Sequence, residues 1–191
     1  MEHQGPVVVG VTGASGAAVA LEVLRGLKAA DVPVALVTTD AAEAVVREEC
    51  DVPIASVRAL AEVTYSDRDL AAPIASGSRP TRGMAIVPCS ANTIAKVANG
   101  LADTLVTRAA HVHLKERRPL VVAPRETPLS PILLRNLTAL SEAGARIVDL
   151  TPAFYLKPRS VDEIARYLAG KVLEQLGIPH RLYRGYKEGT P

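Results

Sequence analysis

Small residues that could hold a phosphate follow the first apolar run, in the segment Gly10-Val-Thr-Gly-Ala-Ser-Gly16. Such residues let backbone N–H groups approach an anion, and the N-terminus of a helix expected from Ala17 adds a favourable dipole. The spacing is GxxGxxG rather than the dinucleotide pattern GxGxxG, and no acidic residue ends the second apolar run before Asp40. A mononucleotide site is therefore favoured, with Ser15 as the side chain that could do more than cap the helix. A glycine turn that only packs helix on strand is the alternative.

A second segment with this arrangement is Pro88-Cys-Ser-Ala-Asn-Thr93, which also follows an apolar run and precedes a helical pattern. Ser90 and Thr93 have the spacing of an N-cap and the third residue of its helix. Capping of the helix and contact with an anion therefore both remain open for this segment.

Charged residues flank a third apolar run, with Lys115 to Arg118 before it and Arg125-Glu126 directly after it. At the carboxyl end of a strand, an arginine can bind phosphate through its fork, and a glutamate can exchange a proton with a leaving group. A solvated charge run would explain the first cluster, but it explains Arg125-Glu126 between two prolines less well.

The elements that must position these motifs alternate between short apolar runs and longer helical patterns. Strands are expected at residues 7–12, 33–38, 84–88, 120–123 and 146–150. Helices are expected at residues 17–30, 39–49, 91–99, 101–110, 131–143 and 160–176, with loops at 66–82 and after 177. The pattern predicts an α/β, Rossmann-like three-layer αβα fold with a mostly parallel sheet, in which ligands bind beyond the carboxyl ends of the strands.

Composition narrows the function classes. The 191 residues suit one domain, placed at residues 1–178 with a C-terminal tail at 179–191, and 48% hydrophobic residues can form a sizeable core. A net charge of +2 and an aromatic content of 3% argue against nucleic-acid partners. No signal peptide or membrane-spanning run is evident, so we expect a cytoplasmic protein without a membrane partner. Cys50 and Cys89 lack CxxC spacing, which favours buried thiols over a metal site or a disulfide.

Together the motifs GVTGASG, SGS at Ser76 to Ser78, PCSANT, LKERRPLVVAPRETPL and AFYLKP resemble the flavin prenyltransferases, the UbiX proteins. The match covers most of the chain in the same order. The resemblance implies a homododecamer that binds reduced FMN and dimethylallyl phosphate. It also implies that the dimethylallyl group is joined to N5 and C6 of the flavin without a metal. The product, prenylated FMN, would then serve a UbiD-type decarboxylase.

The resemblance also implies roles for individual residues, which we carry over motif by motif. The residues that would hold FMN are Gly13, Ala14, Ser15, Thr39, Ser90, Ala91, Asn92, Thr93 and Arg125. The prenyl phosphate would be surrounded by Lys115, Arg125, Glu126 and Tyr155. Glu49 matches an acidic residue near flavin N5, with Ser15 as its partner. Glu126 would protonate the departing phosphate while Lys115 and Arg125 offset its charge.

Two positions depart from the family pattern. Lys171 stands where an arginine usually contacts the prenyl phosphate, and lysine keeps the charge but loses the bidentate fork. Tyr186 stands where a tryptophan commonly closes the site. Both changes bear on the identity of the prenyl donor more than on flavin binding, and monophosphate and diphosphate donors both remain open.

Two other functions remain as alternatives. A non-catalytic flavin-binding or delivery protein would keep the phosphate turn without needing the acid and cations around a second phosphate. The segment SANTIAKVANGLADTL also resembles the cysteine-type flavin decarboxylases. That function is disfavoured because the catalytic histidine and the PxMN motif of those enzymes are missing. His111 and His113 would share one face of a strand, and we interpret them as structural or surface residues.

Overall fold

A parallel sheet formed by short, mostly apolar segments lies at the centre of the fold. The structure is a computed structural model and describes residues 5–185. Its strands are β1 Val7–Val11, β2 Val34–Thr38, β3 Val63–Ser66, β4 Gly83–Cys89, β5 Leu120–Pro124 and β6 Arg146–Ile147. They lie in the order β3-β2-β1-β4-β5-β6, and every neighbouring pair is parallel. The predicted α/β fold is therefore confirmed, with a sheet whose described strands are all parallel.

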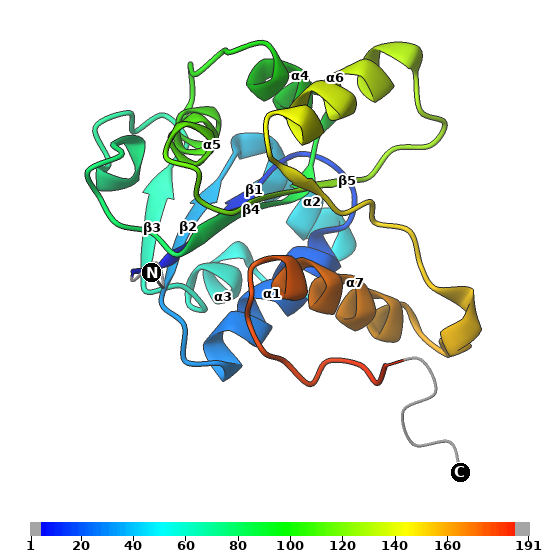
Figure 1. Cartoon of the computed structure of the whole chain (residues 1–191). Coiled ribbons are helices and arrows are strands. Elements are labelled where there is room, and N and C mark those ends of the chain that lie inside the picture. Colours follow the sequence, from blue (N-terminus) through cyan, green and yellow to red (C-terminus); the bar gives the residue numbers. More distant parts are fainter. Residues whose placement is uncertain (1–4, 186–191) are drawn as a thin grey trace.

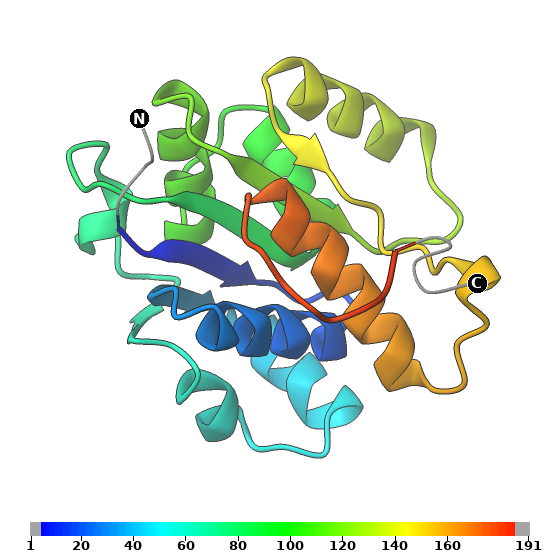
Figure 2. The same cartoon turned by 60° about the horizontal axis from the view of Figure 1, so that its bottom comes forward.

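Helices cover both faces of this sheet (Figure 1). One face carries α4 Ala91–Ala98, α5 Leu105–Lys115 and α6 Pro131–Glu142. The other carries α1 Ala17–Ala29, α2 Asp40–Glu49, α3 Ile54–Arg58 and α7 Val161–Gln175. Figure 2 shows α1 and α7 side by side beneath the strands. Two short 3₁₀ turns, η1 Pro73–Ala75 and η2 Phe154–Leu156, lie in the connections.

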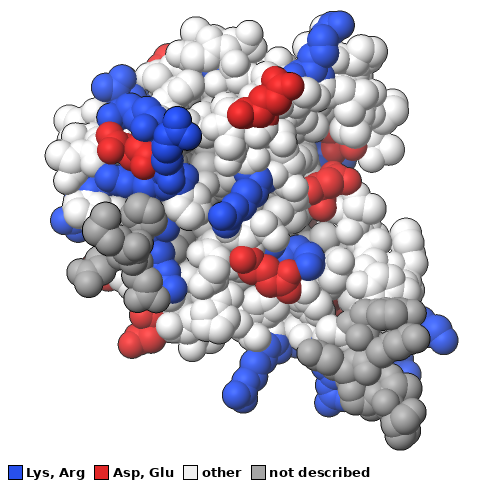
Figure 3. Space-filling model, viewed as in Figure 1, with Lys and Arg blue, Asp and Glu red and all other residues white. Residues whose placement is uncertain are grey.

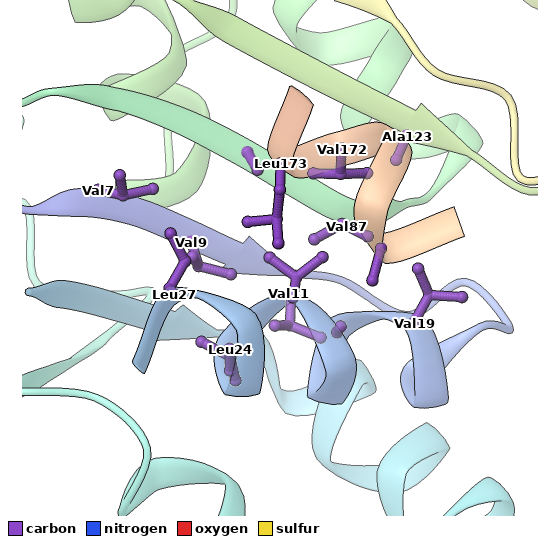
Figure 4. Close-up of a cluster of buried hydrophobic side chains, with 14 of the residues drawn as sticks. Val7, Val9, Val11, Val19, Leu24, Leu27, Val87, Ala123, Val172 and Leu173 are labelled. Carbon is purple, nitrogen blue, oxygen red and sulfur yellow. The ribbon is translucent and has the colours of Figure 1, made fainter. Parts of the chain in front are cut away.

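Alternation along the strands divides the core into two layers. Val7, Val9 and Val11 of β1 pack with α1 and α7, as Figure 4 shows, whereas Val8 packs with the helices of the opposite face. All five residues of β1 are buried, as expected for a central strand covered by helices on both sides.

The order of the strands fixes where a ligand can bind. From β1 the chain builds outward through β2 to β3, then returns to the other side of β1 and builds outward from β4 to β6. The strand order therefore reverses between β1 and β4, and a crevice forms beyond the carboxyl ends of these two strands. Helices α1, α2 and α4 begin at this edge, because each follows one of the strands β1, β2 and β4.

Several predicted elements are corrected. β3 and α3 were not predicted, since β3 is an edge strand with mostly exposed side chains and its sequence lacks an apolar run. The helix expected at residues 101–110 is α5, which begins later because Thr104 and Thr107 form a capping box. α5 also continues through Lys115, and β6 is only two residues long. Among residues 5–185, no helix is long and apolar enough to cross a membrane.

Candidate active site

The two glycine- and serine-rich motifs meet where the strand order reverses. The Thr12 hydroxyl donates a hydrogen bond to the Pro88 carbonyl at 2.8 Å and accepts one from the Ser90 backbone N–H at 2.8 Å. Thr12 is only 1% exposed, so these bonds form away from water. This residue joins the turn after β1 to the turn after β4. Sequence reasoning assigned it no role, because a threonine at the end of a strand carries no distinctive signal.

Two glycines of residues 10–16 are required by the structure. Gly16 precedes α1 with φ of 114°, a left-handed conformation that favours glycine. Gly13 lies against the start of α2, where an added Cβ atom would lie 2.5 Å from the Cβ of Ala41. The first residue thus allows the chain to enter α1, and the second allows α2 to approach the turn closely.

The N-terminus of α1 is occupied by a carboxylate of the same chain. Oε2 of Glu49 accepts hydrogen bonds from the backbone N–H groups of Gly16 at 2.8 Å and Ala17 at 2.9 Å. The sequence favoured a phosphate near this helix end, but in this structure these two donors are taken by Glu49. Glu49 ends α2, which brings its side chain back to the start of α1, and it takes the place of an external anion.

The charge of Glu49 is stabilised at this position. Partial burial raises the pKa of Glu49, but hydrogen bonds from the Ser15 hydroxyl and the two backbone N–H groups outweigh this effect. The positive charge of Arg125 adds to them, so the pKa lies below its ordinary value of 4.5. Glu49 is therefore ionised at neutral pH. The structure places Ser15 with Glu49, the pairing that the resemblance implied, and brings the charge of Arg125 near them.

A cavity of about 370 Å³ opens beside this group. Its polar wall is formed by Ser15, Gly16 and Glu49, and its apolar wall includes Val161 and Ile164 at the start of α7. A site with one polar and one apolar wall suits a ligand that carries both kinds of surface.

Two further helix N-termini with hydroxyl caps lie at the same edge of the sheet. Thr39 caps α2 by accepting a hydrogen bond from Ala42 N–H at 3.1 Å, and Ser90 caps α4 by accepting one from Thr93 N–H at 3.3 Å. The two hydroxyls of Ser90 and Thr93 also lie 3.0 Å apart. Ala91 and Asn92 are exposed in the first turn of α4. Capping is thus confirmed for Ser90 and Thr93, and the exposed start of α4 faces the edge where β4 ends.

Arg125 and Glu126 directly follow β5 and are exposed at this edge. Lys115 is not with them. It ends α5 and precedes β5, so the five-residue strand separates it from Arg125 by about 3.3 Å per residue across the sheet. The expectation that Lys115, Arg125 and Glu126 surround one phosphate is therefore not met within a single chain, because closeness in sequence across a strand means opposite edges of the sheet.

Tyr155 and Lys171 form part of a different group. Tyr155 is 57% exposed in η2 and shares a side-chain hydrogen bond with Tyr167 of α7. Lys171 pairs with Glu174 and lies 3.4 Å from the hydroxyl of Tyr183, and the hydrogen bond to Glu174 raises the pKa of Lys171.

The position of Lys171 along α7 separates it from the cavity. α7 begins at Val161 beside the cavity, and ten residues further along the helix correspond to about 15 Å. The structure does not place Lys171 beside Arg125. Tyr186 lies outside the described residues.

The two histidines of α5 were assigned wrongly to a strand. His113 is fully buried, with Nδ1 2.7 Å from the Ala109 carbonyl and Nε2 2.9 Å from the Thr81 hydroxyl. His111 is half-buried, and residues two apart on a helix point to different sides. Their interpretation as structural residues suits this geometry. Within residues 5–185, no group of three His, Cys, Asp or Glu side chains could hold a metal ion.

Comparison with known proteins identifies the family. The model of the Flavoprotein family matches residues 1–172. A protein of Deinococcus radiodurans named flavin prenyltransferase UbiX is 47% identical over 182 residues, which cover 95% of this chain and 93% of that protein. A protein of the same name from Thermoplasma acidophilum is 46% identical over 178 residues, covering 93% and 98% of the two chains.

Solved structures agree with these relatives. The crystal structure of AnUbiX (PadA1), described as a complex with FMN and dimethylallyl pyrophosphate, has a TM-score of 0.95 at 39% identity. The match covers 98% of this chain and 100% of that one. A dodecameric FMN-dependent UbiX-like decarboxylase from Escherichia coli O157:H7 has a TM-score of 0.91 at 42% identity, covering 95% and 100%.

More distant structures share the fold alone. The FMN-dependent cysteine decarboxylase TvaF is 22% identical with a TM-score of 0.62, and the match covers 87% of this chain and 99% of that one. The resemblance to cysteine-type decarboxylases is therefore one of architecture. With relatives above 40% identity over most of its length, the chain belongs to the flavin prenyltransferase family of flavoproteins.

Proposed function

We propose that this flavin prenyltransferase joins the dimethylallyl group of dimethylallyl phosphate to reduced FMN at the carboxyl ends of β1, β2, β4 and β5. One observation carries the assignment of the site to this edge. The ionised carboxylate of Glu49 and the hydroxyl of Ser15 line the 370 Å³ cavity, and the charge of Arg125 stabilises that carboxylate. A carboxylate with a shifted pKa that lines a cavity at the switch point of a parallel sheet is typical of active sites.

The residues at this edge fit FMN. A Cβ atom on Gly13 would collide with Ala41, so the backbone of the turn passes close to the start of α2. Because Glu49 takes the first N–H groups of α1, the flavin phosphate needs other donors. We assign it to the starts of α2 and α4, at Thr39 and Ser90, where helix N-termini favour an anion. Gly13, Ala14, Ala91, Asn92, Thr93 and Arg125 would complete the flavin site.

Reduced FMN supplies the N5 and C6 atoms to which the dimethylallyl group becomes attached, giving prenylated FMN. The protein's task is to position the donor and to stabilise the phosphate that leaves when its allylic C–O bond breaks. We assign Glu126 as the acid that protonates the departing phosphate, with Arg125 and Lys115 offsetting its negative charge. Glu49 and Ser15 form a hydrogen-bonded pair that can hold or accept a proton near N5.

One chain does not complete this arrangement, because Lys115 lies at the opposite edge of the sheet from Glu126. We therefore propose that Lys115 reaches the donor phosphate from a second copy of the chain in a homo-oligomer, and the Escherichia coli relative is described as a dodecamer. Tyr155 is exposed and could serve the donor from its own chain or from a neighbour. Lys171 would have to leave Glu174 to contact the phosphate.

The proposal also covers the use of the product. Prenylated FMN leaves the enzyme and is bound as a cofactor by a UbiD-type decarboxylase. We place the enzyme in the cytoplasm, where reducing conditions suit its two unpaired cysteines, Cys50 and Cys89.

An anaerobic assay tests the proposed reaction. The protein is mixed with reduced FMN and with either dimethylallyl monophosphate or diphosphate, and the flavin is analysed by mass spectrometry. The proposal predicts a flavin that carries one added five-carbon unit with at least one of the two donors. Unmodified flavin with both donors, from protein that binds FMN, would contradict it.

A further inference from the structure

A group of arginine, lysine and glutamate side chains lies at the opposite edge of the sheet from the cavity, around the end of α5. Lys and Arg gather with acidic side chains among them at the upper left of Figure 3, over the region where Figure 1 shows α5 and the connection between β3 and β4. Residues 76–81 of this connection contain the SGS motif, for which the proposed function has no role. We call them the 76–81 segment.

Arg118 binds the 76–81 segment at three points. Its guanidinium donates hydrogen bonds to the Gly77 carbonyl at 2.6 Å, the Arg79 carbonyl at 2.8 Å and the Thr81 hydroxyl at 3.2 Å. These acceptors lie in different directions, which suits the planar fork of arginine and not the single ammonium of lysine. Arg118 therefore fixes the path of this segment over the end of α5.

A buried chain of hydrogen bonds continues from Thr81 into α5. The Thr81 side chain is 2% exposed and lies 2.9 Å from Nε2 of the fully buried His113. Nδ1 of His113 lies 2.7 Å from the Ala109 carbonyl, which can only accept, so Nδ1 donates this hydrogen bond. The hydrogen bonds thus form a continuous chain from Arg118 through Thr81 and His113 to Ala109. This chain ties the 76–81 segment to the last turn of α5.

Gly77 places this segment directly against Lys115. The Lys115 ammonium pairs with Oε1 of Glu116 at 2.6 Å. A Cβ atom on Gly77 would lie 2.2 Å from that carboxylate oxygen and 2.8 Å from the ammonium nitrogen. The backbone of Gly77 is not left-handed, so the glycine is needed for space and not for its conformation. The backbone of Gly77 therefore packs directly against the ion pair and limits where its two side chains can lie.

We propose that Arg118 is a positioning residue for the prenyl donor, because it holds Gly77 where the Lys115–Glu116 pair is oriented toward the site of a neighbouring copy. The inference rests on the proposed role of Lys115 and adds Arg118, Gly77 and Glu116 to it. The lysine is 62% exposed and its side chain has several rotatable bonds, so without a fixed wall it would sample many orientations. Pre-organising the charge lowers the cost of binding the donor phosphate.

Steady-state kinetics of the assembled enzyme with reduced FMN tests this proposal. We expect Arg118→Ala to raise the KM for dimethylallyl phosphate about tenfold, because hydrogen bonds from a charged group are lost. We expect kcat and FMN affinity to change by less than about twofold. Arg118→Lys keeps the charge but not the three bonds, and its KM should rise almost as much. Arg82→Ala removes a neighbouring arginine charge and serves as the matched control, with KM unchanged.

A second variant covers the case in which Arg118→Ala does not fold. Gly77→Ala displaces the ion pair without straining the backbone, so KM for the donor should rise while the melting temperature is kept. In a Lys115→Ala background neither change should raise KM further, because both act through that lysine.

The outcomes distinguish the role of Lys115 in donor binding from the positioning role of Arg118 and Gly77. If Lys115→Ala raises KM but Gly77→Ala and Arg118→Ala do not, the inference is overturned and the role of Lys115 stands. Full additivity of either variant with Lys115→Ala also overturns it. If Lys115→Ala leaves KM unchanged, Lys115 has no role in donor binding, and the inference fails with it.

Discussion

A single residue decides which anion the start of α1 holds. Glu49 occupies the start of α1, where the glycine-rich turn by itself suggested a phosphate. The carboxylate keeps its charge there because the Ser15 hydroxyl and two N–H groups donate to it and Arg125 lies near. A fixed negative charge beside the flavin site would disfavour a second anion at α1. In the proposed site this charge would direct the flavin phosphate toward the starts of α2 and α4.

The pH dependence of stability tests the charge of Glu49. We expect Glu49→Gln to lower the free energy of unfolding by about 1 kcal/mol at pH 7, allowing for solvent screening of a partly exposed group. The pKa of Glu49 is lower in the folded chain than in the unfolded chain. Its contribution is thus fully present above the ordinary value of 4.5 and is lost as the pH falls through the lowered value. Urea unfolding of both proteins over this range should show the difference shrinking, and a constant difference would contradict this account.

Glu126 is exposed directly after β5, where its carboxyl group can contact a dimethylallyl phosphate bound at the surface of the chain. We expect Glu126→Gln to slow formation of the prenylated flavin about 10²-fold, because the amide cannot protonate the departing phosphate. FMN affinity, measured by flavin fluorescence, should stay the same. Glu62→Gln, at an exposed glutamate directly before β3, is the control. Unchanged turnover in Glu126→Gln would remove this residue as the acid.

Among the elements, Thr12 connects the turn after β1 to the turn after β4, at the sheet edge where we place the flavin. Thr12→Val keeps the volume of the side chain but removes its bond to Pro88 and leaves the Ser90 N–H without that acceptor. We expect the free energy of unfolding to fall by about 2 kcal/mol and FMN binding to weaken.

Thr138→Val provides the comparison for this change. Its hydroxyl is exposed and bonds to Leu134 within α6, so the loss should be small. Equal effects of the two substitutions, in urea unfolding and in an FMN titration, would show that Thr12 does not link the strands.

The sequence indicated most of these elements correctly, and the exceptions have physical causes. Apolar runs and glycine turns identified β1, β2, β4 and β5, because buried parallel strands carry continuous apolar sequences. β3 escaped notice because an edge strand needs no such run. The bond from Thr12 and the return of Glu49 to α1 depend on contacts between residues far apart in the chain, and no local pattern encodes them. The resemblance to a family indicated the pairing of Glu49 with Ser15, which geometry then explained.

At the scale of the whole molecule, β5 separates the two halves of the motif LKERRPLVVAPRETPL. In sequence the motif reads as one unit, whereas in the fold Lys115 and Glu126 lie at opposite edges of the sheet. An active site that needs both must draw them from different copies. In the proposed assembly, Arg118 and Gly77 would position Lys115 for the site of a neighbouring copy, and a single chain alone would turn over slowly.

Complementation between two inactive variants tests this central claim most directly. Lys115→Ala and Glu126→Gln chains are co-expressed so that mixed oligomers form, and prenylated FMN is measured anaerobically by mass spectrometry against each variant alone. The account predicts that mixed oligomers regain part of the wild-type activity, because some sites combine an intact Lys115 from one copy with an intact Glu126 from another. Mixed oligomers no more active than either variant alone would contradict a site shared between copies.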